Sequence, residues 1–199
     1  MARVRGVVVV AALFLSLSGC ANVRSASSDP VTDSASPRPA AVAIVSDPCP
    51  ASTNQRSSPA GGAVFPDQVL ACLGLGPAVQ MSGLIGKPTV VNFWASWCDP
   101  CRREAPRFSH AATVLGSEVR FLGVDVKDDD AGARAFLAEF TIRYPQVTDP
   151  EGTFLAQLHL PGIPVTYLLD RGGQVVYQHI GEMHDADITN LLAAAAKLS

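Results

Sequence analysis

No block of like charges interrupts this sequence of 199 residues, whose formal net charge is −3. Electrostatics alone therefore indicate neither a nucleic acid nor a polyanionic partner. There is no second pair of closely spaced cysteines, and the histidines stand singly: His110, His159, His179 and His184. A structural zinc ion needs four ligands, so we expect no metal and no other cofactor.

The most informative motif is the pentapeptide Trp97–Cys101 (WCDPC), which follows the apolar run Thr89–Trp94 and precedes a helix-like segment. A strand that ends in Cys-x-x-Cys and continues as a helix places a thiol at the positive end of the helix dipole. Such a thiol ionises readily, and the thiolate is the form that attacks disulfides. Pro100 suits the first helical turn, where its missing N–H costs nothing. The motif predicts a redox-active dithiol.

The N-terminus has the three parts of a secretion signal. Arg3 and Arg5 are positive, Val7–Leu17 is an apolar stretch too short to span a bilayer comfortably, and Leu17-Ser18-Gly19-Cys20 ends it. That ending resembles the bacterial lipoprotein box, in which cleavage precedes the cysteine and lipid is attached to it. The alternative is an ordinary signal peptide with a chance cysteine. A lipidated Cys20 would anchor the protein to the outer face of the cell membrane.

Composition divides the chain into three parts. We expect residues 1–19 to be the signal peptide, 20–62 the lipidated cysteine with a flexible tether, and 63–199 one folded domain. The tether is rich in Ser, Ala, Pro and Asp and has no sustained apolar period. It therefore buries too little surface to offset the entropy cost of ordering.

Four cysteines remain if Cys20 carries lipid. Cys98 and Cys101 form the redox pair, which leaves Cys49 to pair with Cys72 in a compartment that permits disulfides. This structural disulfide would tie the end of the tether to the first strand. The alternative is that Cys72 is a small buried apolar residue and Cys49 an unpaired thiol.

The apolar pattern of the domain predicts strands that alternate with helices. We expect strands over 64–73, 78–81, 88–94, 119–126, 144–148, 164–169 and 174–180, and helices over 100–115, 131–140, 151–158 and 185–198. Asp170–Gly173 predicts a hairpin between the last two strands. The pattern indicates an α/β sandwich with a mixed central sheet and helices on both faces.

These residues resemble the thioredoxin fold and, within it, the membrane-anchored thiol-disulfide oxidoreductases similar to TlpA, ResA and CcmG (DsbE). The matching stretches are Gly86–Pro106 and Gly162–Asp170, and the likeness covers the chain from about Ala63 onward. The resemblance implies a thioredoxin fold with a TlpA-like N-terminal hairpin and a central α/β insertion, here over 128–148.

The resemblance also implies roles for residues around the motif. Cys98 matches the exposed attacking cysteine and Cys101 the buried resolving cysteine, while Trp97 joins the substrate-binding surface. Pro164 matches a cis-proline opposite the pair, where the backbone of Ile163 would bind an extended substrate by strand addition.

Two further residues bear on proton transfer. Asn92 takes the place of thioredoxin's buried acid, so proton handling must come from elsewhere. Glu104, three residues after Cys101, matches an acid that this group keeps near the active site. It would exchange a proton with Cys101 or raise the thiol pKa. The alternative is a solvated glutamate on the helix surface.

We therefore expect a lipoprotein that reduces disulfides of exported proteins, such as the haem-attachment cysteines of apocytochrome c. A membrane electron carrier of the CcdA or DsbD type would re-reduce it. Asp99 disfavours the thiolate and favours a reductant, whereas Arg102 and Arg103 act in the opposite sense. Two alternatives are a disulfide-forming oxidase of the DsbE type and a thioredoxin-like module that binds Cu(I) through its soft thiolates.

Overall fold

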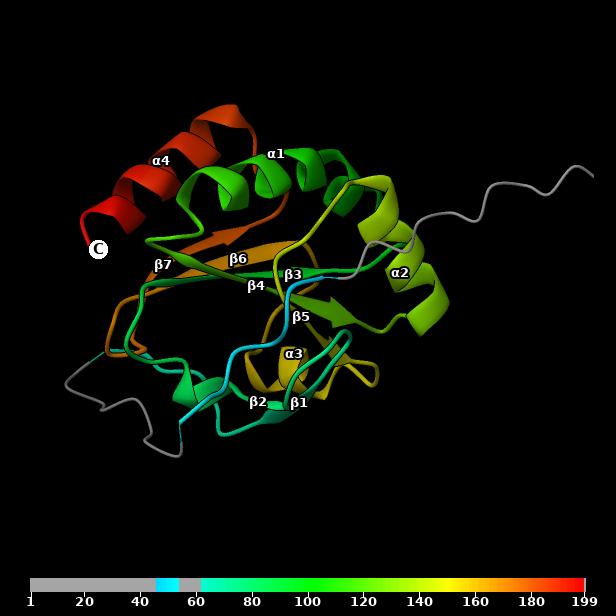
Figure 1. Ribbon diagram of the computed structural model, residues 1–199, viewed down its shortest axis with the longest axis horizontal. Coiled ribbons are helices and arrows are strands. Elements are labelled where there is room, and N and C mark those ends of the chain that lie inside the picture. Colours follow the sequence, from blue (N-terminus) through cyan, green and yellow to red (C-terminus); the bar gives the residue numbers. More distant parts are fainter. Residues whose placement is uncertain (1–45, 54–61, 199) are drawn as a thin grey trace, which may run out of the picture. The chain divides into compact units, whose positions relative to one another are not determined.

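The computed structural model describes residues 46–53 and 62–198 (Figure 1). The signal segment, Cys20 and most of the expected tether lie outside the described residues. The strands of the described part are β1 (Val69–Cys72), β2 (Val79–Gln80), β3 (Thr89–Trp94), β4 (Arg120–Val126), β5 (Gln146–Asp149), β6 (Val165–Leu169) and β7 (Val175–Ile180). The helices are α1 (Asp99–Leu115), α2 (Asp130–Glu139), α3 (Thr153–Gln157) and α4 (Asp185–Ala196), with a short 3-10 turn, η1 (Met81–Gly83).

All seven strands belong to one sheet, in the order β2-β1-β5-β4-β3-β6-β7. β3, β4 and β5 are parallel, whereas β6, β7 and the β1–β2 hairpin join antiparallel. The predicted mixed sheet is confirmed. The N-terminal hairpin is also present, and the expected central insertion contributes α2 and β5.

The central position of β3 follows from its sequence, because every residue of the strand is apolar or hydrogen-bonded and all six are buried. Val90 and Trp94 point into the core beneath α1 and α4, and Val91 and Phe93 point into the opposite core, which includes Phe154 of α3. Figure 1 shows α1 and α4 on one side of the sheet and α3 on the other. This sandwich places the C-terminal end of β3 directly before α1.

Residues 46–53 pack against the domain, although composition placed them in the flexible tether. The backbone N–H of Asp47 donates to Arg143 O (2.5 Å), and that of Cys49 donates to Leu75 O (2.8 Å). Ser52 Oγ accepts from the N–H of Gln80 (2.8 Å). Backbone hydrogen bonds and a disulfide hold this polar stretch, so the packed region begins before the expected boundary at residue 63.

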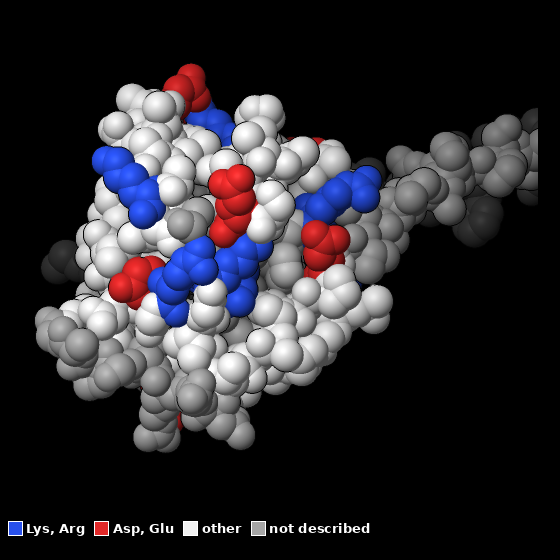
Figure 2. Space-filling model, turned by 60° about the vertical axis from the view of Figure 1, so that its left-hand side comes forward, with Lys and Arg blue, Asp and Glu red and all other residues white. Residues whose placement is uncertain are grey.

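β1 is shorter than the strand expected over 64–73. Val64 forms only an isolated bridge with Gln174, and Pro66 interrupts the segment because it has no N–H to donate. None of the helices in the described part is long and apolar enough to cross a membrane. On the face in Figure 2, Lys and Arg side chains lie next to Asp and Glu side chains, and most of the surface belongs to neither kind.

Candidate active site

The redox motif lies where β3 passes into α1. Cys98 and Cys101 form a disulfide with their Cα atoms 5.3 Å apart. The N–H of Cys98 donates to Ala95 O (3.2 Å), and the N–H of Cys101 points at Cys98 Sγ (3.3 Å). Cys98 is thus the N-cap of α1, and Pro100 lies in the first turn. Reduction would leave the Cys98 sulfur beside unpaired helix N–H groups that stabilise a thiolate.

The exposure expected for Cys98 is wrong for this disulfide form. The residue is only 5% exposed, and Cys101 is 1% exposed as expected for the resolving cysteine. Cys98 is covered because its sulfur is drawn to Cys101 and its backbone folds back on Ala95. Of the two residues, Cys98 keeps the greater exposed fraction, although both are buried.

Trp97 provides the exposed apolar surface beside the pair. Trp97 is 60% exposed, and its Nε1 donates a hydrogen bond to Lys127 O (2.9 Å). Lys127 itself has a left-handed backbone with φ 52°, which turns its carbonyl group toward the ring. The β4–α2 loop therefore fixes an aromatic ring next to Cys98.

Pro164 lies at the same edge of the sheet. The Ile163–Pro164 peptide bond is cis, as the resemblance implied. Val165, the next residue, pairs with Phe93 of β3, so Pro164 stands beside the end of the strand from which the cysteine turn departs. Ile163 is half-buried and contacts both cores.

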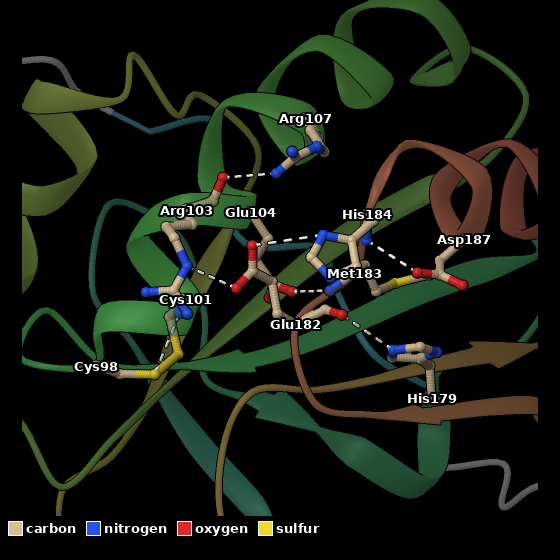
Figure 3. Close-up of polar contacts among 10 residues, drawn as sticks. All are labelled: Cys98, Cys101, Arg103, Glu104, Arg107, His179, Glu182, Met183, His184 and Asp187. Carbon is tan, nitrogen blue, oxygen red and sulfur yellow. Dashed lines mark hydrogen bonds and ion pairs between the residues drawn. A yellow bond between two sulfur atoms is a disulfide. The ribbon is translucent and has the colours of Figure 1, made fainter.

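Glu104 is a buried residue of α1, one turn after Cys101, so the alternative of a solvated glutamate on the helix surface is excluded. It is 1% exposed, and its carboxylate accepts from Asn92 Nδ2 (2.9 Å) and from the N–H of Met183 (2.8 Å). Figure 3 shows the contact with Met183. Burial raises the pKa of Glu104 to about 7, against the opposing effect of the two hydrogen bonds. This carboxyl group can therefore exchange a proton near neutral pH.

Asn92 connects this carboxyl group to the sheet. Its Nδ2 donates both to Glu104 Oε1 and to Thr166 Oγ1 (3.1 Å) on the neighbouring strand β6. Since an amide does not titrate, Asn92 orients the acid without adding a charge of its own. The buried acid of this site is thus Glu104 on α1, whereas β3 contributes only the non-titrating Asn92.

A second buried acid, Asp125, was missed by the sequence reasoning. It stands opposite Trp94 at the end of β4, is 3% exposed, and its Oδ1 has no hydrogen-bond partner among the described residues. Burial and the adjacent Asp128 raise its pKa to about 8. Asp128 in turn accepts from the N–H (2.5 Å) and Oγ (3.0 Å) of Ser96. The sequence did carry a signal for this residue, because Asp125 is an acid within an otherwise largely apolar strand.

The arginines after the motif are engaged by carboxylates. Arg102 Nη2 lies 2.5 Å from Glu139 Oε1, and Arg103 Nε lies 2.7 Å from Glu182 Oε2 (Figure 3 shows the second pair). The carboxylate paired with each arginine therefore partly neutralises the positive charge that would stabilise the Cys98 thiolate. The stabilisation of the thiolate that Arg102 and Arg103 were expected to provide is correspondingly weakened.

The other two cysteines of the described part, Cys49 and Cys72, are also joined, with Cα atoms 6.0 Å apart. This is the pairing expected from the sequence, and it ties residues 46–53 to β1. Within the described ranges, no group of three or more His, Cys, Asp or Glu side chains is placed to hold a metal ion.

The fold and this site together define a thioredoxin-like thiol-disulfide oxidoreductase. The chain belongs to the Redoxin family, which matches residues 59–194.

Two curated relatives and one solved structure agree with this assignment. The chain is 30% identical over 135 residues to the thiol-disulfide oxidoreductase ResA of Geobacillus kaustophilus, covering 67% of this chain and 77% of ResA. It is 35% identical over 102 residues to a thiol:disulfide interchange protein DsbE homolog of Paracoccus denitrificans, covering 51% of this chain but only 55% of that relative. The structure of MTB DsbF in mixed oxidised and reduced forms is 27% identical, with a TM-score of 0.59, and covers 66% of this chain and 98% of DsbF.

Proposed function

We propose that this protein reduces disulfide bonds of exported proteins outside the cytoplasmic membrane, with Cys98 as the attacking and Cys101 as the resolving cysteine. One observation carries the proposal: a Cys-x-x-Cys disulfide caps α1 one turn before a buried glutamate whose pKa is about 7. The relatives named as thiol-disulfide oxidoreductase and thiol:disulfide interchange protein support the same chemistry.

The reaction begins from the reduced pair. The Cys98 thiolate attacks one sulfur of a substrate disulfide, forming a mixed disulfide and releasing the other substrate sulfur as a thiolate that takes up a proton. Cys101 then loses its proton and attacks the Cys98 sulfur. The Cys98–Cys101 disulfide forms, and the second substrate sulfur leaves as a thiol. Two electrons pass from the protein to the substrate.

Glu104 is the proton acceptor that we assign to Cys101. Cys101 is 1% exposed, so solvent does not readily take its proton. Glu104 is the next inward-facing acid on α1, and Asn92 and Met183 fix its oxygens. With a pKa of about 7 it is ionised often enough to accept the proton and weak enough as a base to return it.

Substrate binding is assigned to the surface beside the pair. Trp97 offers an exposed aromatic ring, and the segment Ile163–Pro164 lies at the end of β3 next to the cysteine turn. An extended peptide that pairs with Ile163 would bring its disulfide to Cys98. The haem-attachment Cys-x-x-Cys-His of apocytochrome c, once oxidised, is a substrate of this extended kind.

The charges around Cys98 support electron flow from the protein to the substrate. Arg102 and Arg103 are paired with Glu139 and Glu182, which leaves Asp99 as a negative charge beside the sulfur. A less stable thiolate makes the dithiol a stronger reductant. Equilibration with glutathione or dithiothreitol buffers tests this: a reduction potential near −270 mV, about that of thioredoxin, supports the reductase. A value near that of DsbA, about −120 mV, would identify an oxidase instead.

The Cys20 lipid anchor and a donor of the CcdA or DsbD type complete the proposal, since reduced Cys98 and Cys101 must be regenerated by two electrons from the cell. A Cys101→Ser variant expressed in cells should accumulate mixed disulfides through Cys98, and these can be identified by mass spectrometry. Cys98→Ser is the matched control and should trap far fewer proteins. Capture of small thiols alone would contradict a protein substrate.

A further inference from the structure

A cavity of about 440 Å³ lies at the end of α1 remote from the redox pair. Its wall is formed by the C-terminal half of α1, Lys87 shortly before β3, the start of β4 and the loop before β5. The lining includes Asp47, Lys87, Gly116, Arg120 and Arg143. At 1.5 Å per residue along α1, the lining residues Ser109 and Gly116 lie about 16 Å and about 27 Å from Cys98. The cavity is therefore not part of the active site.

Among the described residues, three cations and one anion line this cavity, in a chain whose net charge is −3. The cations are Lys87, Arg120 and Arg143 and the anion is Asp47, so this part of the lining carries a net charge of +2. Among the described residues, no carboxylate lies within ion-pair distance of Lys87, Arg120 or Arg143. The arginines of the active-site face, in contrast, are paired. The described part of the chain thus places more positive than negative charge at this cavity.

Arg120 is the cation of this cavity that is best suited to bind an anion. The residue is half-buried, and its one side-chain hydrogen bond within the described ranges is a long one, from Nη1 to Thr89 Oγ1 (3.3 Å). Burial also lowers the pKa of its guanidinium. Withdrawing a guanidinium from water without a counter-ion is unfavourable, because the lost hydration is not replaced. An anion in the cavity would replace it, and the planar guanidinium binds two phosphate oxygens at once.

Lys87 is placed to assist. Its Nζ donates to Gly116 O (3.0 Å), the carbonyl at the C-terminal end of α1, and two further N–H groups remain for a ligand. This contact also offsets the negative end of the helix dipole, which would otherwise repel an anion. Arg143 is exposed at the rim and adds charge without a fixed partner in the described part of the chain.

We propose that this cavity binds a phosphate group, through Arg120 and Lys87 with Arg143 at its rim. The chain enters the described region at Ser46, and Asp47 lines the cavity, so the predicted lipid attachment at Cys20 is joined to the domain at this point. The headgroup phosphate of an anionic phospholipid is then the phosphate at highest local concentration. A headgroup bound in the cavity would lie about 16 to 27 Å along α1 from Cys98, which would leave the redox pair accessible to exported proteins.

The test uses the full mature chain with Cys20→Ser, so that an attached lipid does not mask binding. Sedimentation with vesicles of phosphatidylglycerol and phosphatidylcholine is compared with vesicles of phosphatidylcholine alone. A Lys87→Gln/Arg120→Gln variant should lose binding to the anionic vesicles by about tenfold or more. The matched control is Arg134→Gln/Lys197→Gln, which removes the same charge from α2 and from the end of α4 and should change binding less than about twofold.

Inorganic phosphate is the second probe. If the source is a soluble phosphate compound, inorganic phosphate should shift the backbone amide signals of Gly116 and Arg120 in wild type and not in the cavity variant, while vesicles show no difference. Reduction of a small disulfide by every variant verifies that the domain is folded. The proposal is overturned if neither probe binds, or if the control loses binding as much as the cavity variant does.

Discussion

The backbone N–H of Met183 donates a 2.8 Å hydrogen bond to Glu104 Oε2, joining the segment before α4 to the middle of α1. The two residues are 79 positions apart in the sequence. Together with Asn92, this contact fixes a buried carboxyl group three residues after the resolving cysteine on α1. The pKa of Glu104, near 7, therefore depends on how α1, β3 and the segment before α4 pack together. This pKa provides the first test of the mechanism.

Glu104→Gln should slow reduction of a disulfide substrate and change its pH profile. Glutamine keeps the size of the side chain but cannot accept the Cys101 proton. The wild-type carboxylate loses this ability as it protonates below its pKa of about 7, so the wild-type rate should rise through pH 7. At pH 8 we expect the variant to be slower by on the order of a hundredfold, with a smaller difference at pH 5.5. Insulin reduction from pH 5.5 to 9 measures both.

Glu118→Gln serves as the control, because it removes an exposed carboxylate after the other end of α1. Its profile should match that of wild type. An unchanged inflection near pH 7 in Glu104→Gln would show that another group accepts the proton, and the mechanism would have to be revised.

Asp125→Asn should stabilise the protein, and increasingly so as the pH rises. The pKa of Asp125 is raised from 3.8 to about 8, so the folded state keeps a proton that the unfolded state releases above pH 4. The wild-type free energy of unfolding therefore falls between about pH 4 and pH 8, whereas asparagine does not titrate. Urea unfolding at pH 4, 6 and 8 should show a growing difference. A constant difference would mean that Asp125 is already ionised in the fold.

Trp97→Ala should separate large substrates from small ones. The ring is 60% exposed and lies beside the redox pair, so it can bury surface against a protein substrate but not against a small disulfide. We expect kcat/KM for a protein disulfide to fall by about tenfold and the rate with a small aromatic disulfide to change little. Leu75→Ala, which removes an equally exposed apolar side chain from another surface, should leave both rates unchanged.

The central fold could be predicted because its signals are local. β3 and β4 are nearly continuous apolar runs, and their observed ends lie within about a residue of those expected. α1 also begins at the motif as predicted, since Cys98 and Pro100 together specify a helix start. Weakly patterned segments were less predictable: α3 has only five residues, and β1 is interrupted before Val69.

The site was predictable in its sulfur chemistry but not in its protonation. The motif located Cys98 and Cys101, and the resemblance pointed to Glu104, but its burial requires Met183 and Asn92 from distant elements. The accessibility of Cys98 was overestimated because a pattern does not report how a disulfide draws a side chain inward. Residues 46–53 were assigned to the tether because their packing depends on backbone hydrogen bonds, which composition does not encode.

Cys49→Ser/Cys72→Ser should destabilise the domain without changing the redox pair. The disulfide closes a loop with a sequence separation of 23, and in the chain-entropy estimate its loss costs about 3 kcal/mol of unfolding free energy. The Cys98–Cys101 disulfide belongs to the opposite core, so its reduction potential should stay the same. The backbone amide of Asp47 lies in residues 46–53, and that of Gln80 donates to Ser52 in the same segment. Both amides should exchange faster with solvent. Equal stability with unchanged exchange would show that the backbone contacts alone hold this segment in place.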